Sequence, residues 1–73
     1  MYNVLCNQRG TFILDIMDKP ENFNSLDEVK DFLIEYHSID NNLKELRKLN
    51  LNQILEIFDW SIIKVKNILT TIK

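Results

Sequence analysis

The sequence predicts an α+β domain in which a small antiparallel sheet packs on two to three short helices. Three observations support this fold class. Two β-like runs, residues 2–7 and 11–17, flank a short loop that ends in Gly10. Apolar residues then recur at helical spacing between residues 26 and 58. A run rich in aromatic and β-branched residues begins at Trp60.

The chain of 73 residues is long enough for one domain, which we take to span residues 1–73. A chain of this size buries only about 60% of the surface that its unfolded form exposes. It therefore needs a well-packed core or a second copy of itself, and a homodimer stays open. Cys6 stands alone, which excludes an internal disulfide and favours a reducing compartment. With no signal pattern and no apolar run near the length of a membrane span, we expect a cytoplasmic protein.

The two N-terminal runs predict a β-hairpin. Gly10 supplies the positive φ that a short hairpin loop needs. In the second run, Phe12, Leu14 and Ile16 alternate with Thr11, Ile13 and Asp15, as in a half-buried strand. Pro20 lacks the N–H that a ladder requires, so residues 18–24 are predicted to be a loop.

Residues 25–58 predict the helices. Ser25 and Glu28 fit a capping box, and the helix that they open should end near His37. After a turn, short helical stretches follow from Leu43 and from Leu51, the second capped by Asn50 or Asn52. The residues expected to form the core are Leu26, Val29, Phe32, Leu33, Leu46, Leu51, Leu55 and Phe58.

The C-terminal segment is compatible with two structures. As a helix, Ile62, Val65, Leu69 and Ile72 would share a face; as a strand, residues 60–66 would be suitably rich in aromatic and β-branched residues. A lone two-stranded hairpin is marginal in water, and a third strand would stabilise it. We therefore favour a strand over residues 60–66.

Residues 52–69 resemble a helix-turn-helix. Ile54, Ile57, Trp60, Val65 and Leu69 fall at its apolar positions, and Ser61 falls at the cap of its second helix. Leu55 stands where that family usually has a small residue, and Asp59 stands where it usually has a turn glycine. The exposed start of the recognition helix would be mostly apolar, which suits base edges poorly. This resemblance implies a DNA-binding regulator that uses residues 51–69, an alternative we keep.

Two other segments, SLDEVKDFLIEYHSID and LNLNQILEIFDWSIIKV, carry spaced motifs. The first is of the type L-E-E-V-x-x-F-L-x-x-Y-H, and the second ends on W-x-I-x-x-V. Together they resemble a group of small proteins from phages of low-GC Gram-positive bacteria, in which a hairpin precedes the helix and the second motif is a closing strand. Some small phage proteins inhibit bacterial defence, including anti-CRISPR proteins. The resemblance implies a protein that binds and inhibits a host protein.

Residue types that carry chemistry are scarce. One His and one Cys provide no nucleophile–base pair and too few ligands for a zinc site within the chain. The single Gly excludes a glycine-rich phosphate loop. We therefore expect no enzyme activity, no cofactor and no metal. Cys6 is interpreted as a small core residue, and His37 as a helix-end residue.

Charge is distributed unevenly along the chain. The formal net charge of −2 is too balanced for a nucleic-acid footprint. Asp27, Asp31 and Glu35 stand at i, i+4 and i+8, so they form an acidic stripe on the outer face of the first helix, flanked by Glu28. The acidic stripe is either a solvated helix face or a docking surface for a basic partner. A basic cluster of Lys44, Arg47 and Lys48 allows the same two interpretations.

These observations favour a protein-binding module. Its expected partner is a host protein with a basic surface, such as a nucleic-acid-binding enzyme; neither membrane binding nor direct nucleic-acid binding is expected. The candidate binding residues are Asp27, Glu28, Asp31, Glu35 and Trp60. Trp60 is either a core residue or an interface residue, because tryptophan is common in both places. A DNA-binding regulator and a structural or assembly protein are the alternatives.

Overall fold

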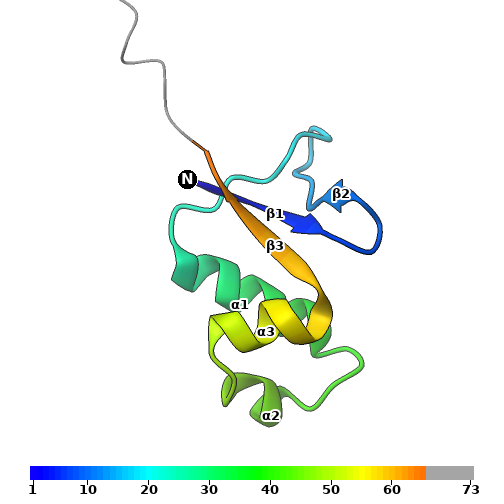
Figure 1. Cartoon of the computed structure of the whole chain (residues 1–73), viewed down its shortest axis with the longest axis vertical. Coiled ribbons are helices and arrows are strands. Elements are labelled where there is room, and N and C mark those ends of the chain that lie inside the picture. Colours follow the sequence, from blue (N-terminus) through cyan, green and yellow to red (C-terminus); the bar gives the residue numbers. More distant parts are fainter. Residues whose placement is uncertain (66–73) are drawn as a thin grey trace, which may run out of the picture.

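A computed structural model of the chain describes residues 1–65 and shows the predicted α+β fold (Figure 1). The elements in chain order are β1 (Tyr2–Cys6), β2 (Thr11–Phe12), α1 (Leu26–His37), α2 (Leu43–Arg47), α3 (Leu51–Phe58) and β3 (Trp60–Lys64). The helices lie on one side of the sheet, with α2 at the end of the molecule farthest from the loop that follows β2 (Figure 1).

The sheet is antiparallel with strand order β2-β1-β3, so the first and last strands of the chain lie side by side. Val4 pairs with Ile62, and Cys6 pairs with Trp60. This confirms the predicted third strand and its partner, the N-terminal hairpin. The strand ends at Lys64, and residue 66 of the predicted range lies outside the described residues, as do Leu69 and Ile72 of the helical alternative.

The second hairpin strand is much shorter than predicted. Only Thr11 and Phe12 form a strand, whereas the sequence indicated residues 11–17. The reason is competition for the edge of β1: Tyr2 exchanges two backbone hydrogen bonds of 2.8 Å with Phe23. Because Phe23 holds this part of the edge, the chain leaves β1 after Ile13, whose N–H donates to the carbonyl of Val4 at 2.9 Å.

Residues 13–21 instead fold back on themselves, and we call this segment the finger. The N–H of Glu21 donates to the carbonyl of Ile13 at 2.8 Å, and the N–H of Asp15 donates to the carbonyl of Lys19 at 2.7 Å. Leu14 and Pro20 form a bridge between these bonds, so part of the predicted loop is extended and paired. The finger sits beside β2 and projects from the end of the molecule opposite α2 (Figure 1).

Side-chain caps fix the helix starts where the sequence placed them. Ser25 Oγ accepts from the N–H of Glu28 at 3.2 Å, which is the first half of the predicted capping box. A complete capping box is found at α3 instead: Asn50 Oδ1 accepts from the N–H of Gln53, and Gln53 Oε1 accepts from the N–H of Asn50. Among residues 1–65, no helix combines the length and the apolar character needed to cross a membrane.

The core lies between the sheet and the helices. Its buried residues are Val4, Phe23, Val29, Leu33, Ile34, Leu46, Ile54 and Trp60. Three predicted core residues are among them, and four more pack against it while partly exposed: Phe32, Leu51, Leu55 and Phe58. Leu26 is the exception, with 43% of its surface exposed, because it borders an open hollow between the starts of α1 and α3.

Candidate partner-binding site

The acidic stripe forms one wall of an open groove between α1 and α2. Asp27, Asp31 and Glu35 are all exposed and all line this groove. The spacing of four residues in a continuous helix places the three carboxylates in one row, as the sequence predicted. The structure adds that the row faces a hollow with a volume of about 1020 Å³ rather than a flat surface.

The rest of the groove combines an apolar floor with basic groups. Ile34, of which 6% is exposed, and Leu43, of which 39% is exposed, supply the apolar part. Lys30 lies on the same helix as the acidic stripe, and Arg47 comes from α2. The groove is therefore not uniformly acidic: three carboxylates and two cationic side chains share it. Such a lining suits a polypeptide surface better than the mostly apolar lining of small-molecule sites.

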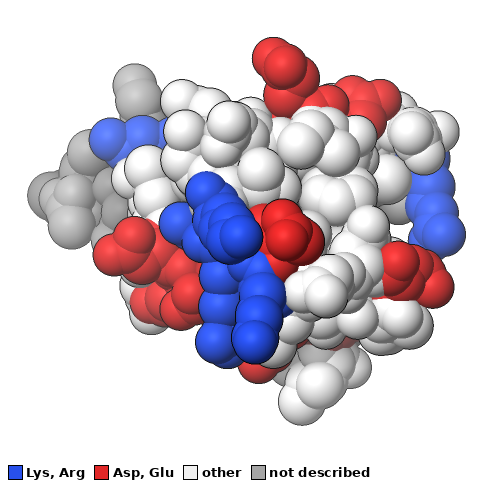
Figure 2. Space-filling view, turned by 90° about the horizontal axis from the view of Figure 1, so that it is seen from below, with Lys and Arg blue, Asp and Glu red and all other residues white. Residues whose placement is uncertain are grey.

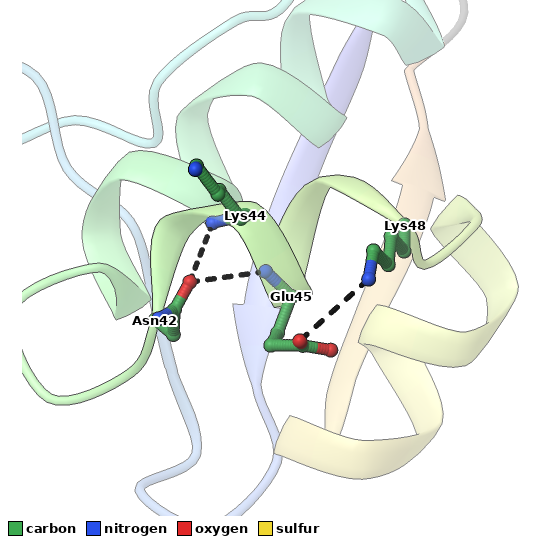
Figure 3. A network of polar contacts seen from close by, with 4 residues as sticks. All are labelled: Asn42, Lys44, Glu45 and Lys48. Atoms are coloured by element: carbon green, nitrogen blue, oxygen red, sulfur yellow. Dashed lines mark hydrogen bonds and ion pairs between the residues drawn. The ribbon is translucent and has the colours of Figure 1, made fainter.

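A side-chain cap fixes the start of α2, the helix that lines one side of the groove. Asn42 Oδ1 accepts from the N–H groups of Lys44 at 2.9 Å and of Glu45 at 3.3 Å (Figure 3). Lys48 Nζ lies 3.7 Å from Glu45 Oε1 (Figure 3), a pair in which both side chains are more than two-thirds exposed.

Seen from the α2 end, basic side chains form a compact patch with acidic side chains on both sides (Figure 2).

The carboxylates of the acidic stripe have no ion-pair partner among residues 1–65. Within this part of the chain the ion pair of Lys48 with Glu45 is the one closer than 4.0 Å. Asp27 lies in the first turn of α1, where the helix dipole favours an anion. Glu35 lies near the C-terminal end of α1, where the dipole disfavours one. The helix dipole therefore stabilises a carboxylate at position 27 but not at position 35.

The other two candidate residues lie apart from the groove. Glu28 is exposed in the first turn of α1, and its N–H is held by the Ser25 cap. Trp60 is buried, with 7% of its surface exposed, so the structure supports the core interpretation of this residue rather than the interface interpretation. Its indole ring contacts Tyr36 edge-on, with the ring centroids 5.6 Å apart.

Trp60 is joined to His37 at the end of α1. Trp60 Nε1 donates to His37 Nε2 at 2.9 Å, and the His37 ring stacks on Phe58 with centroids 3.7 Å apart. Burial among these rings lowers the pKa of His37 below its usual value, against the opposing attraction of Asp40. His37 does end the helix, as predicted, but it acts as a neutral acceptor rather than as a cation on the helix dipole.

The helix-turn-helix alternative requires a second helix that begins near Ser61. The structure has strand β3 at this place, from Trp60 to Lys64. Asp59 does adopt the left-handed turn conformation, with φ +60°, that the resemblance assigned to this position. The turn, however, leads from α3 into a strand, so no recognition helix follows α3 within residues 1–65.

Within residues 1–65, His, Cys, Asp and Glu side chains do not gather in groups of three that could hold a metal ion. Comparison with known protein families, curated proteins and solved structures found no match for this chain.

Five residues of the groove were not assigned to the same site as the acidic stripe. They are Lys30, Ile34, Ser38, Leu43 and Arg47, of which Arg47 was predicted only as part of a basic cluster. The positions of Leu43 and Arg47 depend on how α2 packs on α1, and helical spacing within one element carries no information about that contact. Lys30 and Ile34 lie on α1 three residues after Asp27 and Asp31, so helical spacing could have placed them beside the acidic stripe. A second omission was the finger, where Ile16 and Met17 are exposed. The signal was present, since two apolar residues stand between Asp15 and Asp18.

Proposed function

We propose that this chain is a protein-binding module that docks the groove between α1 and α2 onto a basic surface of a partner protein. The observation that carries the proposal is the row of Asp27, Asp31 and Glu35, exposed along one wall of a groove and without an ion-pair partner among the described residues. A basic protein surface would complement this row and would associate faster at low ionic strength.

The apolar floor supports a docked complex rather than a transient encounter. Ile34 and Leu43 line the groove together with its charged side chains. Side chains of a partner that reach this floor would bury apolar surface, while its basic groups meet the carboxylates at the rim, as in interfaces with an apolar centre and a polar edge. The resemblance to small phage proteins suggests a host protein as the partner, bound and inhibited in the host cytoplasm, with an inhibitor of bacterial defence as the most specific form.

The experiment begins with affinity capture from host cells, followed by association kinetics with the purified candidate. Replacing Asp27, Asp31 and Glu35 together by Lys should slow association and reverse or flatten its dependence on ionic strength. A matched control replaces Glu21, Glu45 and Glu56 by Lys, which changes the net charge equally but leaves the groove wall intact. If both triple variants slow association to the same extent, net charge and not the groove determines binding, and the proposed site is wrong.

A further inference from the structure

The tip of the finger exposes an unusual amount of apolar surface for so small a protein. Ile16 is 100% exposed and Met17 is 71% exposed, and Leu14 beside them is 51% exposed. Ile16 and Met17 are adjacent at the tip of the finger, and Leu14 lies two residues before Ile16 on the same segment. Contiguous exposed apolar surface of this kind is a common mark of an interaction site, whereas scattered apolar residues are not.

The tip is held in one conformation by the backbone around it. Asp15 Oδ1 accepts from the N–H groups of Met17 at 2.8 Å and of Lys19 at 3.1 Å. Asp18 adopts a left-handed conformation with φ +59°, and its N–H donates to the carbonyl of Asp15 at 3.1 Å. A turn fixed in this way presents its apolar side chains outward, and little backbone conformational entropy remains to be lost when they bind.

The same chain carries a hollow of suitable character at the base of the finger. It has a volume of about 210 Å³. Its lining residues are Cys6, Arg9, Thr11, Phe12, Ile13, Leu14, Tyr36 and Trp60. An apolar protein cavity of roughly 150 Å³ accepts a benzene-sized molecule, so this space can take the side chain of an isoleucine or a methionine. Arg9 is the one charged residue in this lining.

We propose that two copies of the chain associate through their fingers, with Ile16 and Met17 of each copy entering the hollow at the base of the other finger. The two fingers would lie antiparallel and would be related by a two-fold axis. The tip of each finger would therefore reach the hollow of the other copy. Such an interface is self-complementary and closes after two copies, so no filament forms. The carboxylate of Asp18 beside the tip would meet Arg9 beside the hollow.

A second copy explains these features better than a membrane does. Residues 15–21 contain Asp15, Asp18 and Glu21 against one Lys19, and such an acidic tip is repelled by anionic lipid surfaces. Burying Leu14, Ile16 and Met17 also offsets the small core of a 73-residue chain. Because the finger and α2 lie at opposite ends of the molecule (Figure 1), the groove stays free on each copy, and the dimer would present two grooves.

Sedimentation equilibrium over a wide concentration series tests the association directly. Wild type should pass from monomer to dimer mass as its concentration rises. Ile16→Asp should weaken dimerisation by about a hundredfold or more, because both copies lose a buried anchor. The variant should fold normally, since Ile16 is fully exposed. The control is Ile57→Asp, which should dimerise like wild type, because Ile57 is 59% exposed on α3 and lies outside the finger and the hollow.

A cross-link then tests the register of the interface. Under oxidation, Ile16→Cys should form a disulfide with Cys6 of a second copy, since Cys6 lines the hollow. Mixing ¹⁵N-labelled with unlabelled protein distinguishes bonds between copies from bonds within one copy, and Ile57→Cys should not link to Cys6. A wild type that remains monomeric at every concentration would overturn the proposal. So would an Ile16→Asp variant that dimerises like wild type, or an introduced thiol that never reaches Cys6 of another copy.

Discussion

The indole N–H of Trp60 donates to Nε2 of His37 at 2.9 Å and thereby joins the first residue of β3 to the last residue of α1. The two residues are 23 positions apart, and the bond gives the buried indole nitrogen its partner. It also requires an unprotonated His37 Nε2, because an imidazolium has no acceptor. One hydrogen bond therefore couples the sheet, the end of the long helix and the protonation state of a histidine.

The first prediction concerns the pH dependence of stability. The pKa of His37 is lowered in the folded protein, chiefly by burial, so the unfolded chain takes up the proton first as pH falls below about 6.5. The stability that neutral His37 contributes is fully present above that pH and is lost as pH falls towards the folded pKa. In urea titrations, wild type should lose more stability over this window than His37→Gln, which keeps an acceptor but does not titrate. A difference between the two proteins that does not change with pH would contradict this.

A second prediction ranks the two helix caps. Ser25→Ala should lower the free energy of unfolding by about 1 kcal/mol through loss of one capping hydrogen bond. Asn50→Ala should cost more, because the reciprocal bond from the Asn50 N–H to Gln53 is disturbed as well. Thermal unfolding of the two variants and of Gln53→Ala measures the order. Asn52→Ala serves as the control, and a cost equal to that of Asn50→Ala would mean that α3 begins elsewhere.

The third prediction concerns the hairpin loop. Gly10 has φ +68°, and a Cβ atom built there would touch nothing within 4 Å. Gly10→Ala should therefore destabilise the protein by about 1 kcal/mol through the left-handed backbone alone. Gly10→Asn should cost less, since asparagine tolerates this conformation better. Denaturant unfolding of both variants is the measurement, and equal costs would contradict the assignment of the penalty to the left-handed φ.

A fourth prediction compares two leucines that the sequence placed on the same helix face. Leu33 is fully buried, so Leu33→Ala should cost about 2–5 kcal/mol and leave so small a domain largely unfolded. Leu26→Ala should lower the free energy of unfolding clearly less, because Leu26 is 43% exposed. Circular dichroism under native conditions distinguishes the outcomes. Similar losses for both variants would mean that Leu26 packs more deeply than the structure shows.

The fifth prediction is an expected failure to bind DNA tightly. Specific binding to duplex DNA at physiological salt requires a basic protein surface and a helix or β-ribbon that reaches the base edges. The chain has a net charge of −2, and β3 occupies the place of a recognition helix. Fluorescence anisotropy with random and selected duplexes should show only weak, salt-sensitive binding. A sequence-specific complex of nanomolar affinity in about 150 mM salt would restore the regulator hypothesis.

Sequence patterns located the acidic stripe but not its surroundings. Asp27, Asp31 and Glu35 share a wall because four-residue spacing in a helix is a local property. Leu43 and Arg47 join them through the packing of α2 on α1, which no spacing within either helix encodes. The same limit applies to Trp60, for which the sequence left core and interface open. Its burial depends on the contact between the start of β3 and the end of α1, two segments that are distant in the chain.

The sequence by itself determined the features that depend on residues close together in the chain. The start of α1 at Ser25 and the positive φ of Gly10 follow from capping and turn chemistry. For the segment from Trp60, local sequence left strand and helix open, and pairing with the distant β1 decided for the strand. The tertiary structure decided features that depend on competition between distant segments. Phe23 takes the edge of β1 that the second hairpin strand was expected to occupy, and this releases residues 13–21 as the finger. The physical reason is that each backbone donor and acceptor of β1 pairs once, so the segment that pairs best displaces the other, and a local pattern cannot show which one that will be.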